Sequence, residues 1–203
     1  MDFTHAVARI RVMEKRLLNK NTIEKLLEAE GYKEALKILG DTSYGSSIGD
    51  LETVHDYEKI LKEEIIDLYK TMYQITPLSK VIDIMTLRYD YHNFKVLLKS
   101  KALGKDLSHL LISAGALSTD ALKGYLFSNE LKEMDEHFRQ IILRVEEDFE
   151  ESKNPQVIDI ELDKCLYSHM LQLASELGID FITAYVKQSI DIINIKTMLR
   201  VQK

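Results

Sequence analysis

Apolar residues recur at spacings of three and four along most of the chain, which is the pattern of helices that bury one face. The clearest stripe predicts a helix over residues 51–75. Its apolar members are Tyr57, Leu61, Ile65, Leu68, Met72 and Ile75. A second stripe precedes the break at Asn154–Pro155 and contains Leu131, Met134, Phe138, Ile141, Val145 and Phe149. These stripes predict an all-α protein.

Capping residues and glycines divide the rest of the chain into further helices. We expect Asn21, Asp159 and Asp180 to cap helix N-termini, because short polar side chains accept hydrogen bonds from the free amides there. Glycine favours helix ends, and it follows several of these stripes. The remaining helices are expected over residues 5–18, 22–30, 32–39, 89–101, 106–113, 118–126, 160–177 and 181–203.

A short motif occurs twice. Residues 90–99 (DYHNFKVLLK) and 191–200 (DIINIKTMLR) share the pattern D-x-x-N-[FI]-K-x-[LM]-L-[KR], and Asp90 and Asp191 are 101 residues apart. This separation is close to half the chain, so it indicates an internal duplication. We expect two pseudo-symmetric helical bundles, a first repeat over residues 1–104 and a second over 105–203.

The motif places polar side chains within an apolar stripe. At about 100° per residue, Asp90 and Asn93 share a helix face with Phe94 and Leu97. A buried polar group without a partner costs about 1–3 kcal/mol. We therefore interpret this pair, and the equivalent Asp191 and Asn194, as buried residues that hydrogen-bond one helix to its neighbour; direct ligand contact is the alternative.

Basic side chains of the same helices lie away from the apolar stripe. Arg88, Lys95 and Lys99 form one short strip, and Lys196 and Arg200 form another. Two interpretations remain open at this stage. The strips are either solvated surface or a binding face for an acidic partner.

Composition narrows the class of protein. Of 203 residues, 45% are hydrophobic, and only 8 Gly and 2 Pro interrupt the chain, which favours long helices. The net charge of −6 argues against binding nucleic acid or an anionic membrane surface. Cys165 is the single cysteine, which excludes an intrachain disulfide and fits a reducing compartment. No stretch is long and apolar enough to insert in a membrane, so we expect a cytoplasmic protein.

Residue patterns of known catalytic and metal sites are missing. The 6 His are scattered, and Glu133 and His137 form an i,i+4 pair of potential ligands with no second such pair of Glu and His. The chain lacks the H-E-x-x-H, G-x-S-x-G, G-x-G-x-x-G and phosphate-loop motifs. We therefore predict that the protein has no catalytic residue and binds no cofactor or metal, so that it is not an enzyme.

The duplicated motif resembles that of one protein family. Together with the opening segment Ala8–Leu18, the Tyr44-Gly45 pair and the run Leu87–Asn93, it is similar to the C subunit of the prokaryotic V-type (A-type) ATPase or ATP synthase. This family includes the d subunit of the eukaryotic V-ATPase. The resemblance extends through the whole chain, although the family is built from three such repeats and two are found here.

The resemblance implies a non-catalytic function. The C subunit of this family is a funnel-shaped helical spacer in the central rotor of the ATPase. It links the central shaft to the membrane rotor ring and passes torque between them, on the cytoplasmic side and peripheral to the membrane. The expected partners are therefore the shaft subunits and the rotor ring. The alternative is a helical adaptor or scaffold of another complex.

Overall fold

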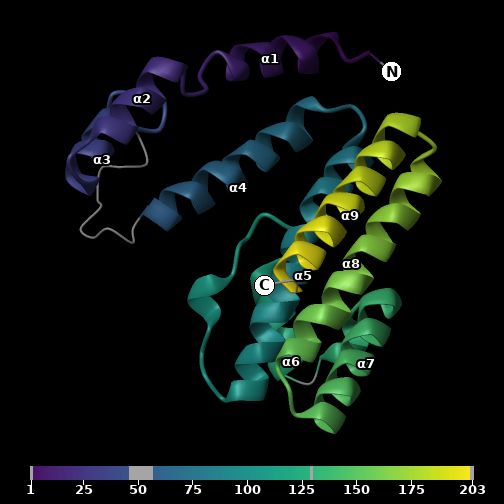
Figure 1. The fold of residues 1–203 in the computed structure, drawn as a ribbon. Helices are drawn as coiled ribbons and strands as arrows, with labels where there is room; N and C mark the ends of the chain where they lie inside the picture. The colour runs from purple at the N-terminus through teal and green to yellow at the C-terminus, as the bar shows by residue number, and fades with distance from the viewer. Residues whose placement is uncertain (1, 46–56, 129, 202–203) are drawn as a thin grey trace. The chain divides into compact units, whose positions relative to one another are not determined.

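The computed structural model describes residues 2–45, 57–128 and 130–201. Within these ranges the regular structure is entirely helical and no strand forms, which confirms the all-α prediction. The chain divides into two compact units, Met1–Ser79 and Lys80–Lys203. Figure 1 shows their helices. The repeat boundary expected between residues 104 and 105 concerns sequence duplication, and it stays a prediction.

Residues 2–45 and 57–79, the described part of the first unit, form four α-helices. They are α1 (Thr4–Glu14), α2 (Lys20–Glu28), α3 (Tyr32–Gly40) and α4 (Tyr57–Ile75). Helix α1 contacts α4, and α2 contacts α3. The predicted end of the fourth helix at Ile75 is confirmed, whereas its predicted start lies outside the described residues.

Two boundaries in this unit differ from expectation. Helix α1 ends at Glu14, before the predicted Leu18. The N-cap of α2 is Asn19 and not Asn21, because Thr22 N–H donates to Asn19 Oδ1 over 2.9 Å. Asn19 has an extended backbone, with φ −80° and ψ 166°, as an N-cap requires.

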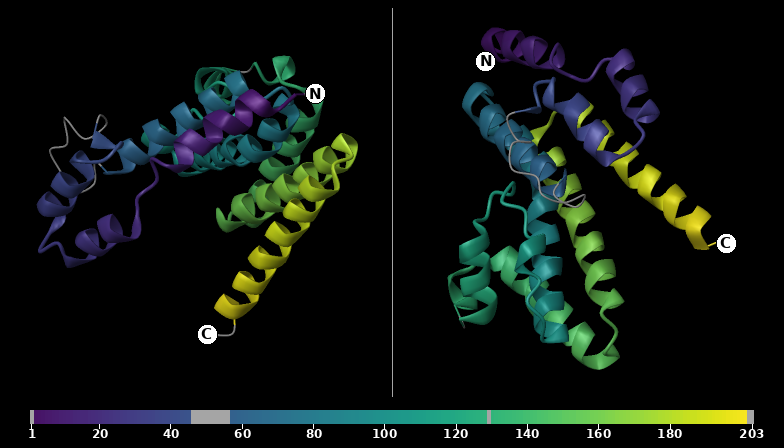
Figure 2. Two further views of the ribbon diagram at one scale, coloured as in Figure 1. Left: turned by 90° about the horizontal axis from the view of Figure 1, so that it is seen from above. Right: turned by 90° about the vertical axis from the view of Figure 1, so that its left-hand side faces the viewer.

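The described residues 79–128 and 130–201 form five α-helices and two short 3₁₀ turns. The helices are α5 (Ser79–Leu103), α6 (Thr119–Phe127), α7 (Glu136–Ser152), α8 (Gln156–Leu177) and α9 (Asp180–Val201). The turns are η3 (Ser108–Leu110) and η4 (Leu131–Glu133). Helix α8 packs between α7 and α9, which Figure 2 shows from two further directions.

Helix α5 is the centre of this unit and is buried on nearly all sides. Its buried positions include Tyr91 and Phe94, each 0% exposed, and they pack with Leu122 of α6, Ile142 of α7 and Leu162 of α8. A helix buried all round has no single apolar stripe. The predicted start after Arg88 is wrong, because neither Gly nor Pro interrupts the chain between Pro77 and Gly104 and the helix is continuous.

Two helix ends in the second unit follow local rules. Ser118 caps α6 by accepting from Ala121 N–H over 3.1 Å, and Gly178, with φ 69°, ends α8 as predicted. The predicted N-caps Asp159 and Asp180 are wrong, since α8 begins at Gln156 after Pro155 and Asp180 is already the first residue of α9. The helix predicted over residues 106–113 is only the η3 turn.

Candidate functional site

Asn93 of α5 binds the backbone of the segment that follows its own helix. Its side chain is 0% exposed. Asn93 Nδ2 donates to Ile112 O over 2.8 Å, and Asn93 Oδ1 accepts from Ile112 N–H over 2.9 Å. One side-chain amide thus satisfies both backbone groups of one residue, as a neighbouring strand would do.

Asp90, one turn earlier on α5, binds the same segment further along. It is 1% exposed and accepts from Ala116 N–H over 3.1 Å and from Leu117 N–H over 2.9 Å. Burial raises the pKa of Asp90 to about 6, although these two hydrogen bonds oppose the shift. Asp90 and Asn93 together form a clamp, which we call the backbone clamp.

Gly115 allows the segment to approach the clamp closely. A Cβ at this position would lie 2.7 Å from Asp90 Cγ and 3.1 Å from Asp90 N, far inside normal contact distance. Within the helix expected over residues 106–113, the N–H and C=O of Ile112 bond to Asn93 and not to a helical turn. Burial and hydrogen bonding of Asp90 and Asn93 are confirmed, but the partner is this non-helical segment and not a neighbouring helix.

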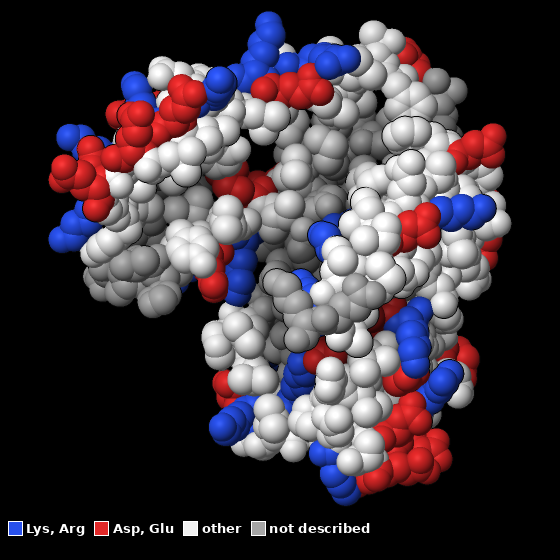
Figure 3. Space-filling model, in the orientation of Figure 1, with Lys and Arg blue, Asp and Glu red and all other residues white. Residues whose placement is uncertain are grey.

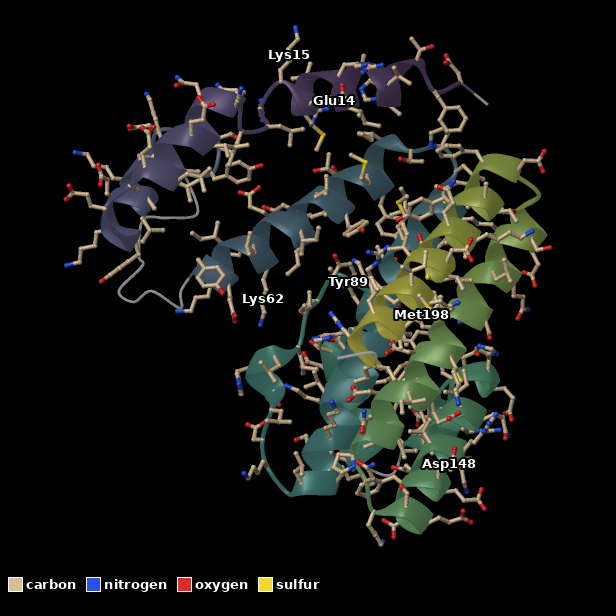
Figure 4. The ribbon with its side chains drawn as sticks, viewed as in Figure 1. Glu14, Lys15, Lys62, Tyr89, Asp148 and Met198 are labelled. Atoms are coloured by element: carbon tan, nitrogen blue, oxygen red, sulfur yellow. The ribbon has the colours of Figure 1, made fainter. Side chains whose placement is uncertain are left out.

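The second copy of the motif has different surroundings. Asp191 and Asn194 are exposed, as are all residues from 191 to 200, so the prediction that this pair is buried is wrong. The reason is that no described element packs on this half of α9 in the way the 105–117 segment packs on α5. Figure 4 labels Met198, which lies on this half of the helix.

The basic residues of α5 form ion pairs within the unit. Lys95 Nζ lies 2.6 Å from Asp163 Oδ1, and Lys99 Nζ lies 2.6 Å from Asp159 Oδ2, both on α8. The lysine side chains are only 20% and 30% exposed. Their expected outward orientation is therefore wrong, because α8 covers this side of α5 and presents two carboxylates one turn apart.

The other predicted basic residues differ among themselves. Arg88 is exposed and its Nη2 donates to Tyr185 OH of α9 over 3.4 Å. Lys196 and Arg200 are exposed, as expected. A role of Arg88, Lys95, Lys99, Lys196 and Arg200 in partner binding stays a prediction.

Reversing the charges of Lys95 and Lys99 to Glu is expected to destabilise the second unit by about 1–3 kcal/mol. Each substitution would place a carboxylate against an aspartate of α8 in a partly buried site. Urea denaturation monitored by circular dichroism measures this loss of stability. Adding Asp159→Lys and Asp163→Lys should restore much of the stability by re-forming the pairs with opposite polarity. A four-fold variant no more stable than the double variant would contradict this account.

An aromatic cluster that the sequence did not reveal joins α5, α7 and α8. Tyr91 OH lies 3.3 Å from His169 Nδ1, and the rings of His137 and His169 are 4.3 Å apart between centroids. Phe138 packs on both Tyr91 and His169. Burial, followed by the nearby His137, lowers the pKa of His169 to about 4. The residues are far apart in sequence and follow no motif, so no pattern could have indicated the cluster.

His169 is expected to make the fold less stable in acid. The pKa of His169 falls from 6.5 to about 4 on folding, so between these pH values the folded protein binds fewer protons than the unfolded protein. The free energy of unfolding therefore decreases as pH drops from 6.5 to about 4. The pKa of Asp90 is raised on folding, so Asp90 stabilises the fold as pH drops and opposes the effect of His169. The measurement therefore compares the parent protein with the His169→Gln variant. The variant should lose less melting temperature between about pH 7 and pH 4.5. Parallel melting curves for the two proteins would exclude His169 as the cause.

The chemistry of the described residues is that of packing and hydrogen bonding. In residues 2–45, 57–128 and 130–201, no three His, Cys, Asp or Glu side chains are placed to hold one metal ion. Figure 3 shows acidic and basic groups interspersed, with acidic groups gathered near the end of α7, where Asp148 lies (Figure 4). The described part of the chain is an all-α protein with both signs of charge on the face shown.

None of the described helices combines the length and apolarity that crossing a lipid bilayer demands.

Comparison with known proteins identifies the family. Residues 6–203 match the protein-family model described as ATP synthase (C/AC39) subunit. The chain belongs to this family, which confirms the resemblance seen in its motifs and the expectation of a structural, non-catalytic subunit.

Individual relatives agree with this assignment. The C subunit of the V-type sodium ATPase of Enterococcus hirae is 31% identical over 191 residues, covering 94% of this chain and 58% of the relative. The C subunit of the A-type ATP synthase of Methanocaldococcus jannaschii is 27% identical over 217 residues, covering 98% and 54%. That of Pyrococcus abyssi is 28% identical over 213 residues, covering 98% and 56%. The chain thus spans a little over half the length of these relatives.

Proposed function

We propose that the chain is a non-catalytic subunit of the central rotor of a V-type ATPase or ATP synthase. In this role it is a spacer or socket between the central shaft and the membrane rotor ring, and it transmits torque for ATP-coupled ion transport. The observation that carries the proposal is the family match over residues 6–203. The helical architecture and the structural use of Asp90 and Asn93 support a mechanical role.

The proposed partners are the shaft subunits on one side and the rotor ring on the other. The proposed location is the cytoplasmic face of the membrane, reached through the complex and without insertion of this chain. The rigid core around α5, with its interhelical ion pairs to α8, suits a part that must transmit force without deforming.

Co-purification from native membranes tests the proposal. An affinity-tagged chain, expressed in cells that lack the untagged chain, should recover the ATPase shaft and ring subunits together. Cells without the chain should keep ATP hydrolysis by the catalytic head but lose ATP-driven ion transport, and the reintroduced chain should restore it. Recovery of an unrelated complex, with ion transport unaffected, would overturn the proposal and favour a helical adaptor.

A further inference from the structure

The 105–117 segment, which joins α5 to α6, is only lightly anchored in the core. Ala114 is its one buried apolar side chain, at 5% exposure, while Leu110 is 38% exposed. Figure 1 shows the segment running beside α5, with the η3 turn as its helical part. Gly104, with φ 61°, follows α5 at one end, and Ser118 caps α6 at the other. The two ends are therefore fixed to helices, whereas the residues between them depend on local contacts.

Side chains of α5 hold the backbone of this segment. Ser100 Oγ accepts from Leu107 N–H over 3.4 Å, and His92 Nε2 donates to Leu110 O over 3.0 Å. The backbone clamp binds the rest of the segment. All of these bonds can break without loss of a hydrogen bond within an α-helix, so the segment can open as a unit of its own.

One of these contacts carries an electrostatic penalty. The Asp90 carboxylate is 1% exposed, and both of its hydrogen bonds come from neutral backbone amides. The facing residues 113–118 (SAGALS) contain no ionisable side chain, and Asp83 on the same helix adds a repulsive carboxylate. A charged carboxylate in such a site is stabilised when water reaches it. His92 donates to the segment whether or not its ring carries a second proton, so Asp90 is the group whose charge favours opening.

We propose that the 105–117 segment is a strap that opens away from α5, between Gly104 and Ser118, while the helices stay folded. Hydration of the Asp90 charge favours the open form, and the uncharged Asp90 favours the closed form. Opening exposes the clamp side of α5 to water. This conformational switch does not depend on the rotor role proposed above.

The pH dependence of the switch has a definite sign. In the closed form burial raises the pKa of Asp90 to about 6, and a hydrated carboxyl in the open form regains its ordinary value of 3.8. Between these pH values the closed form binds more protons than the open form, so acid favours closing. Because one pKa unit corresponds to a tenfold change, the equilibrium constant for opening should rise about tenfold or more between about pH 4.5 and pH 7.5.

Native-state hydrogen exchange of the full chain, measured by NMR, tests the strap. The protection factor, which is the ratio of intrinsic to observed exchange rate, reports the opening equilibrium at each amide. The amides of Ala116 and Leu117 should be at least about tenfold less protected than those of Phe94 and Leu97 in the middle of α5, because these need unfolding of the helix. From about pH 4.5 to pH 7.5, protection of Ala116 and Leu117 should fall about tenfold or more.

A charge-removing variant and a matched control identify the group responsible. In Asp90→Asn, the protection of Ala116 and Leu117 should no longer fall as pH rises, whatever its absolute value. Asp120→Asn makes the same change at an exposed position of α6, next to the segment, and should keep the fall seen in the parent protein. Strap amides as protected as those of α5, or protection in the parent that does not fall with rising pH, would overturn the proposal. A fall that persists in Asp90→Asn would do the same.

Discussion

Asn93→Ala is expected to lower the free energy of unfolding of the second unit by about 2–4 kcal/mol. The substitution leaves the N–H and C=O of Ile112 without their partner in a site that is 0% exposed. Each buried backbone group that loses its hydrogen bond contributes about 1–3 kcal/mol. Urea denaturation monitored by far-ultraviolet circular dichroism measures the change.

Asn194→Ala is the matched control for this prediction. It removes the same side chain from the same position of the motif, but on the exposed half of α9. Asn194→Ala should change the free energy of unfolding by no more than about 0.5 kcal/mol, as for most surface substitutions. Similar losses for the two variants would show that the contacts of Asn93 with Ile112 do not stabilise the fold.

Gly115→Ala is also expected to have a large effect, lowering the free energy of unfolding of the second unit by about 3 kcal/mol. The added methyl group would lie 2.7 Å from Asp90 Cγ and 3.1 Å from Asp90 N. Because one of these atoms is backbone in the middle of α5, the 105–117 segment must move away. That movement breaks the hydrogen bonds of Ala116 and Leu117 to Asp90.

Gly124→Ala provides the control within the same unit. A Cβ there meets only the carboxyl end of Glu130, a flexible side chain that can turn away. Alanine is also a better helix former than glycine by up to about 1 kcal/mol, so α6 should be unaffected or slightly stabilised. If Gly115→Ala also left the free energy of unfolding unchanged, the close approach of the 105–117 segment to α5 would not require glycine at position 115.

Features set by local sequence were predictable. The ends of α4 at Ile75 and of α8 at Gly178 follow from apolar spacing and glycine, and the expected helix over residues 118–126 agrees with α6 to within one residue. The cap of α2 was misplaced because Asn19 and Asn21 both fit by residue type, and backbone geometry decides between them. The environment of Lys95 and Lys99 was misjudged because helical spacing cannot reveal that α8 covers the polar side of α5.

The candidate site was predictable only in part. The place of Asp90 and Asn93 in an apolar stripe correctly indicated that they are buried and hydrogen-bonded. The partner could not be predicted, since the residues around Ile112 have the composition of a helix but form a non-helical segment bound to α5. Burial of Asp191 and Asn194 was inferred from repetition alone, and it fails because burial depends on what packs against a motif.

The ion pairs between α5 and α8 have a consequence for the order of events on the ribosome. Lys95 and Asp163 are 68 residues apart, so α5 leaves the ribosome roughly 3–14 s before its partner at ordinary synthesis rates. During that interval, the apolar surface destined for α8 has nothing to cover it. A nascent chain arrested between α7 and α8 should therefore bind chaperones and be cut readily by protease, and release from both should begin once α8 has emerged.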